Sequence, residues 1–70
     1  MSRYLVVVEQ GPTSYGAWVP DLPGCAAVAE SADEARELIR DAIVMHLEGL
    51  REQGLTIPQP LSEPAWAESA

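Results

Sequence analysis

Few side chains in this 70-residue chain could take part in catalysis. His46 is its single histidine, so a serine nucleophile with a histidine base would depend on that residue alone. No third group is marked to orient His46, and its place between Met45 and Leu47 favours a packed or half-exposed position on a helix. Asp21 and Glu30 could pair as carboxylates, but a turn at Asp21 and a helix start after Glu30 explain both without such a pair. We therefore expect no enzymatic activity.

Metal, cofactor and redox chemistry find no support in the sequence either. Cys25 is the single cysteine, so it has no partner for a disulfide, a redox pair or a cysteine-based metal site. No His-x-x-x-His spacing occurs, and Gly11, Gly16 and Gly24 are spaced for turns rather than for a phosphate loop. We expect no cofactor and no metal, with Cys25 as a small buried strand residue.

In the stretch from Trp18 to Cys25, side-chain type and spacing are both constrained, and the expected fold is organised around it. Pro20 and Pro23 each fix φ and remove a backbone donor, and Gly24 supplies whatever turn angle the chain needs. The chain is therefore apolar up to Val19, forms a rigid corner over residues 20–24, and is apolar again from Cys25. This pattern predicts a strand, a tight connection and another strand.

Strands are expected over residues 4–8, 15–19 and 25–29, with a hairpin loop at 10–14. The first of them does not alternate polar and apolar residues, so both of its faces are apolar, as in a strand covered on both sides. The members of the two faces are Tyr4, Val6 and Val8 on one and Leu5 and Val7 on the other.

A long helix is expected after the strands. Ser31 followed by Glu34 forms a capping box at its start, and Gly54 is a natural residue to end it, about twenty residues later. Apolar residues recur at helical spacing along one stripe: Ala35, Leu38, Ile39, Ala42, Ile43, Leu47 and Leu50.

These elements predict an α+β fold, in which a three-stranded antiparallel sheet carries one long helix on one face in the order β-β-β-α. We expect one domain over residues 1–60 and a proline-containing C-terminal arm over residues 61–70. Three prolines between residues 58 and 64 predict an extended arm or edge segment, with a short fourth strand as a possibility.

The charge balance bears on the kind of partner. Eleven acidic residues face four arginines and no lysine, for a net charge of −7 at pH 7. Such a surface repels phosphate backbones, so we expect no direct binding to nucleic acid. It suits a basic protein partner, and the alternative is that the charge serves solubility only. No apolar run approaches the roughly 20 residues of a membrane span, and no signal peptide is apparent, so we expect a cytoplasmic protein.

One helix can cover only one face of the sheet, so apolar residues of the other face need a second cover. Exposed apolar patches of this kind usually mark an interface, and we expect a homo-oligomer, a protein partner, or both. Trp18, Asp21 and Trp66 are the candidate partner-binding residues, the two tryptophans because this residue is enriched at interface hot spots. For each tryptophan the alternative role is packing in the core or contact with another copy of the chain in a homo-oligomer interface.

The pattern Tyr15-x-Ala17-x-Val19-Pro-Asp-Leu-Pro-Gly-Cys25, with the capped helix after it and Pro58-x-Pro60, resembles the HicB-like antitoxin family over roughly residues 3–60. The resemblance implies a β-β-β-α-β unit related to a degraded ribonuclease H fold. It also implies that the chain binds and neutralises a small basic HicA-type toxin, an mRNA-cleaving ribonuclease. The alternative is a stand-alone structural or ligand-binding homo-oligomer of the same fold with no toxin, and a vestigial nuclease comes third.

Three departures from the family pattern stand out. Ala29 occupies the place of a usual glycine, so the third strand is expected to end differently. The segment that usually forms a fourth strand is short here and carries Pro64. Many members continue into an operator-binding segment, for which the chain leaves no room before Ala70, so DNA binding is not carried over to this chain.

Overall fold

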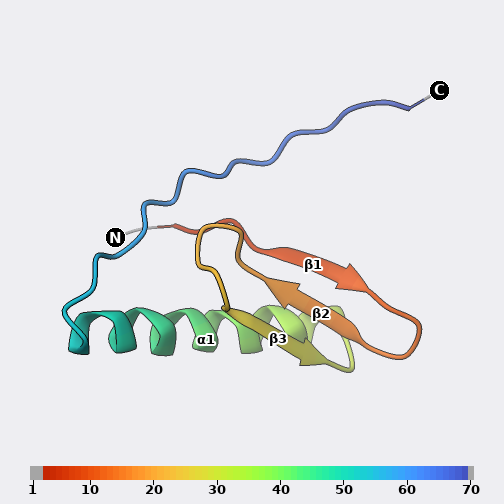
Figure 1. Ribbon diagram of the computed structural model, residues 1–70. Coiled ribbons are helices and arrows are strands. Elements are labelled where there is room, and N and C mark those ends of the chain that lie inside the picture. Colours follow the sequence, from red (N-terminus) through yellow and green to blue (C-terminus); the bar gives the residue numbers. More distant parts are fainter. Residues whose placement is uncertain (1–2, 70) are drawn as a thin grey trace.

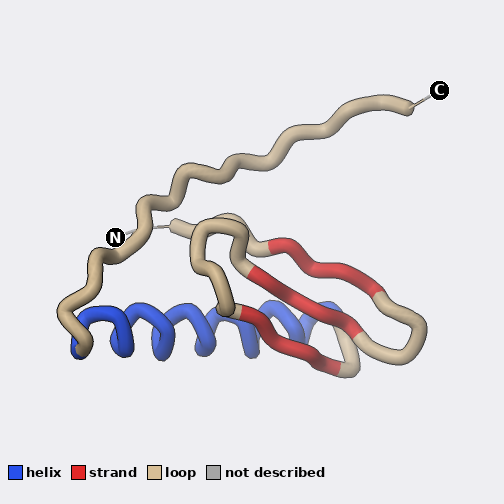
Figure 2. Tube along the Cα trace, viewed as in Figure 1, coloured by secondary structure: helices blue, strands red, loops and turns tan. Residues whose placement is uncertain are grey.

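The computed structural model describes residues 3–69, and its core is a two-layer α+β unit. Strands β1 (Val7–Gln10), β2 (Tyr15–Trp18) and β3 (Ala26–Ala29) form one antiparallel sheet in the order β1-β2-β3. Helix α1 (Ala32–Glu52) lies along one face of this sheet (Figures 1 and 2). The predicted fold class and the single long helix are thereby confirmed.

Two strands begin later than predicted. Strand β1 begins at Val7, opposite Trp18 at the end of β2, rather than at Tyr4. Beyond Trp18 the chain turns away into the corner, where Pro20 has no N–H to offer, so the residues before Val7 have no ladder partner in β2. Strand β3 begins at Ala26, because the carbonyl and amide of Cys25 are already engaged in the corner.

The buried residues come from the helix-facing side of the sheet, the corner and one stripe of α1. Alternation along β2 turns Ala17 inward and leaves Trp18 on the opposite face. Alanine in the central strand lets the helix approach the sheet closely. The core is made of Ala17, Val19, Leu22, Cys25, Ala29, Ala35 and Ile39.

Both ends of α1 are capped by the residues that the sequence marks. The Ser31 hydroxyl accepts a hydrogen bond from the Glu34 amide at 3.1 Å, which confirms Ser31 as the N-cap. The Glu34 carboxylate accepts from the amide of Glu30 at 3.2 Å, one residue earlier than in the usual capping box. At the other end Gly54 has φ +70°, and the Leu55 amide donates to the Leu50 carbonyl at 2.9 Å, as in a Schellman motif.

The corner between β2 and β3 consists of two successive turns. The Leu22 amide donates to the Val19 carbonyl at 3.1 Å, and the Cys25 amide donates to the Leu22 carbonyl at 3.0 Å. Pro23 and Gly24 are central in the second turn, where Gly24 has φ +85°, the combination that a type II turn requires. The Val19 amide closes the corner by donating to the Cys25 carbonyl at 3.2 Å.

The chain after α1 is an extended arm, which we define as residues 57–69. No strand forms between Gln53 and Ser69, so the possible fourth strand is not present in the described part of the chain. Hydrogen bonds join the arm to the body at two points. The Tyr4 hydroxyl donates to the Pro58 carbonyl at 2.6 Å, and the Asp21 carboxylate accepts a hydrogen bond from the Ser62 amide. Beyond these contacts the arm leaves the body (Figure 1).

Within residues 3–69, no helix combines the length and the hydropathy needed to cross a bilayer.

Two glycine substitutions should change stability in opposite directions. A Cβ added at Gly24 or Gly49 meets nothing within 4 Å, so only backbone conformation decides the outcome. Gly24→Ala forces a left-handed alanine, and we expect a loss of about 1–2 kcal/mol in the free energy of unfolding. Gly49→Ala lies inside α1, where we expect a gain of up to about 1 kcal/mol. Denaturant unfolding at one protein concentration measures both, and a neutral Gly24→Ala would contradict the turn assignment.

Candidate protein-binding surfaces

The residues that could do chemistry lie apart from one another. His46 is half-buried on α1, as predicted, and Asp21 and Glu30 lie at the corner and before the helix. Cys25 is 5% exposed, and burial raises the pKa of its thiol, which keeps it protonated and unreactive at neutral pH. Among residues 3–69, no three His, Cys, Asp or Glu side chains gather as metal ligands would. Within residues 3–69 these side chains therefore form no metal-type cluster, and the surfaces are the remaining candidate sites.

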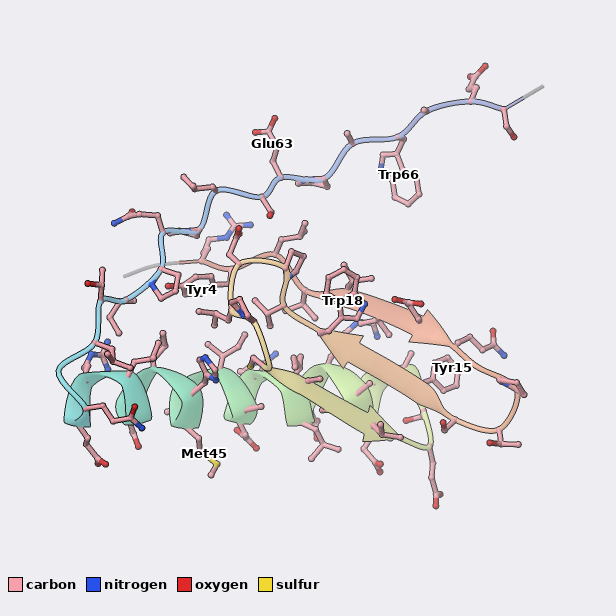
Figure 3. The ribbon with its side chains drawn as sticks, in the orientation of Figure 1. Tyr4, Tyr15, Trp18, Met45, Glu63 and Trp66 are labelled. Atoms are coloured by element: carbon pink, nitrogen blue, oxygen red, sulfur yellow. The ribbon has the colours of Figure 1, made fainter. Side chains whose placement is uncertain are left out.

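Two of the three predicted partner-binding residues, Trp18 and Trp66, lie on different parts of the molecule (Figure 3), and the third, Asp21, lies in the corner. Trp18 is 42% exposed on the sheet face away from α1, where its indole N–H donates to the Glu9 carboxylate. Trp66 is 97% exposed on the arm. Asp21 accepts from the Ser62 amide and from the Ser62 hydroxyl, each at 2.9 Å, so it is tied to the arm four residues before Trp66.

The sheet face away from α1, which we call the open sheet face, has no cover within residues 3–69. Because paired residues share a face in an antiparallel ladder, it is formed by Val7, Glu9, Gly16, Trp18, Ala26 and Val28. Val28 is 71% exposed, and a shallow hollow of about 340 Å³ lies between the two side chains Trp18 and Val28, above Gly16. The prediction that one face would remain uncovered by the helix is confirmed.

The outward side of α1 carries a line of carboxylates, which we call the acidic row. Their spacing of four, four, seven and four residues keeps them on one side of a helix with 3.6 residues per turn. All are exposed: Asp33, Glu37, Asp41, Glu48 and Glu52. Beside the row, two apolar side chains of the same helix, Leu38 and Met45, are 40% and 72% exposed.

Positive charge gathers at one other place, which we call the arginine groove. This groove, of about 610 Å³, runs between the segment before β1 and the flank of α1. Arg3, Arg36 and Arg40 line it, which is three of the four arginines in the chain. Its remaining lining is apolar: Tyr4, Val6, Ile39, Ile43, Val44 and Leu47. This groove was not predicted from the sequence, although Arg36 and Arg40 flank the apolar stripe at helical spacing.

One arginine of the groove, Arg36, also forms an ion pair with a carboxylate of its own helix. It pairs with Asp33 at 2.7 Å on the helix surface, and both side chains are largely exposed, so this ion pair contributes little to stability. It is the one ion pair within residues 3–69, which leaves Arg3 and Arg40 without a carboxylate partner there.

Together these observations describe a small α+β domain that offers charged and apolar surfaces. Residues 4–69 match the family described as "HicB_like antitoxin of bacterial toxin-antitoxin system". The chain belongs to this family.

Two curated relatives are similar to this chain. An uncharacterised 14.9 kDa protein of Haemophilus phage HP1 is 32% identical over 56 residues, covering 80% of this chain and 42% of the phage protein. A UPF0150 protein of Archaeoglobus fulgidus is 38% identical over 47 residues, covering 66% of this chain and 68% of that protein. This chain therefore spans less than half the length of its phage relative. No solved structure matches the chain.

Removing the carboxylate of Asp21 should release the arm. A hydrogen bond to a charged group contributes about 1.5–3 kcal/mol, and Asp21 accepts two from Ser62. In Asp21→Ala we expect amide hydrogen exchange at Ser62 to accelerate by at least about tenfold, because the arm opens more often. Asp33→Ala is the matched control, since the Asp33 carboxylate is 95% exposed and pairs with Arg36. Unchanged exchange at Ser62 in Asp21→Ala would refute this attachment.

Proposed function

We propose that this chain is an antitoxin that binds a small basic HicA-type toxin and neutralises it by covering the surface with which the toxin approaches mRNA. The acidic row is the observation that carries this proposal. A ribonuclease must approach RNA phosphates, so its working surface is basic, and a line of exposed carboxylates can compete for it. Membership in an antitoxin family supports the same conclusion.

Occlusion requires no catalytic group in the antitoxin, so His46, Cys25 and Asp21 need no catalytic role in it. The apolar side chains beside the row, Leu38 and Met45, supply surface that water leaves on binding and that salt does not screen. Carboxylates then set how fast the two proteins meet, and the apolar contacts set how slowly they separate. We place this binding in the cytoplasm, where mRNA is translated.

Trp18 is a second candidate contact for the toxin, through the open sheet face. Its indole edge is held by Glu9, which orients the ring without burying it. A partly exposed tryptophan beside an exposed valine has the composition of an interface centre. The same face also favours the alternative function, a homo-oligomer with no toxin. Trp18→Ala and Asp41→Arg separate the two surfaces, because each changes only one of them.

Salt and charge reversal test the acidic row. With the HicA-type toxin encoded beside this gene, association should slow by at least about tenfold between 0.1 M and 1 M NaCl, where the screening length falls from about 10 Å to about 3 Å. Asp41→Arg, at the middle of the row, should slow association at 0.1 M and lose that effect at 1 M. Glu30→Arg is the control, since it changes net charge equally from a position before the helix.

Two outcomes would contradict these statements separately. If no complex with that toxin forms at low salt, the antitoxin function is wrong and the stand-alone oligomer remains. If a complex forms but is indifferent to salt and to Asp41→Arg, the function stands and the acidic row is not the binding surface.

A further inference from the structure

The arginine groove has no role in toxin binding as proposed above. Its charge has the wrong sign for a basic partner, because it holds three of the four arginines of a chain whose net charge is −7. Arg3 and Arg40 have no carboxylate partner within residues 3–69. An apolar floor with a positive rim fits an occupant that is both apolar and acidic.

The outer part of the arm has that composition. Residues 61–69 include Glu63 and Glu68 and no basic residue. Leu61 is 81% exposed and Trp66 is 97% exposed, so the two largest apolar side chains of this segment face water. A tryptophan that is almost wholly exposed on an extended segment is typical of a binding element without its partner.

The outer part of the arm, residues 61–69, does not occupy the groove of its own chain, although the hydroxyl of Tyr4, a groove residue, donates to the Pro58 carbonyl at the base of the arm. Asp21 ties it to the body at Ser62, and residues 63–69 make no hydrogen bond within the described chain. Figure 1 shows the arm rising from the end of α1 and diverging from that helix toward its own C-terminal end. The groove lies along α1 between Arg36 and Leu47, and none of its lining residues belongs to the arm.

We propose that residues 61–69 of one protomer occupy the arginine groove of a second copy, and that the exchange is reciprocal. Trp66 and Leu61 then cover the apolar floor, and Glu63 and Glu68 face the arginines of the rim. Reciprocal exchange gives a closed two-fold dimer, in which every arm and every groove is filled and no further copy can add.

The size of the contact fits a stable dimer. Each protomer contributes its arm and its groove lining, which together approach the roughly 20–30 residues a side of a standard interface. The acidic row lies outside the groove lining, so the dimer still presents it to a toxin. This assembly is independent of the proposed antitoxin function, and either can fail alone.

Sedimentation velocity on the purified chain tests the exchange. Wild type should sediment as a dimer at micromolar concentration. Trp66→Ala should raise the dimer dissociation constant at least about tenfold, as expected for an interface hot spot. Met45→Ala is the control, because Met45 is also an exposed apolar residue but lies outside the groove.

Charge reversal tests the rim. Arg40→Glu should weaken the dimer, whereas Arg51→Glu should not, since Arg51 is the one arginine that does not line the groove. Combining Arg40→Glu with Glu63→Arg and Glu68→Arg should restore part of the lost affinity. Circular dichroism of each variant verifies that α1 is retained.

The proposal is overturned if wild type is a monomer up to high micromolar concentration. It is equally overturned if a dimer forms that Trp66→Ala and Arg40→Glu leave unchanged, because that dimer would use another surface such as the open sheet face.

Discussion

The burial of Leu22 at the tip of the corner is the contact on which the rest of this small structure depends. Leu22 is fully buried although it lies between two turns, because its amide and carbonyl are both used within the corner and its side chain points into the core. The prolines on either side limit the conformations that the corner can adopt before folding. With the corner fixed, β2 and β3 pair in one register, and Ala17 and Ala29 face the helix.

The same corner also sets the position of the arm. Asp21 directly precedes Leu22. Because the Leu22 side chain points into the core, the Asp21 side chain points away from it, and its carboxylate accepts two hydrogen bonds from Ser62. A core built on one side of a three-stranded sheet leaves the open sheet face uncovered. Helix α1 carries the acidic row on its outward side and two of the arginines on the flank toward the groove, and Arg36 and Asp33 pair where the two meet. Several surfaces of different chemistry thus follow from a single core.

The parts of the fold that depend on local chemistry were predictable from the sequence. Ser31, Glu34 and Gly54 mark the ends of the helix through caps that involve only neighbouring residues, and the structure confirms them. The corner was predictable for the same reason. The start of β1 was not, because the apolar run from Tyr4 has strand character throughout and only pairing with β2 limits it.

Features that join distant residues could not be read from the sequence. Asp21 and Ser62 lie 41 residues apart, and no local pattern connects them. The arginine groove needs Arg3 to come beside α1, which follows from the packing of the segment before β1. Trp18 and Trp66 were recognisable as candidate partner-binding residues from their residue type, whereas their exposure, 42% and 97%, depends on packing that no local pattern sets.

Titration of toxin activity tests the central claim, neutralisation by a surface, most directly. The purified HicA-type toxin is incubated with increasing amounts of this protein, and cleavage of a defined RNA is measured. Neutralisation by a surface predicts that residual cleavage falls in proportion to the antitoxin added and ends at a fixed stoichiometric ratio, with free RNA competing against inhibition. Full RNA cleavage in the presence of a molar excess of this protein would contradict it, as would inactivation by a small fraction of an equivalent.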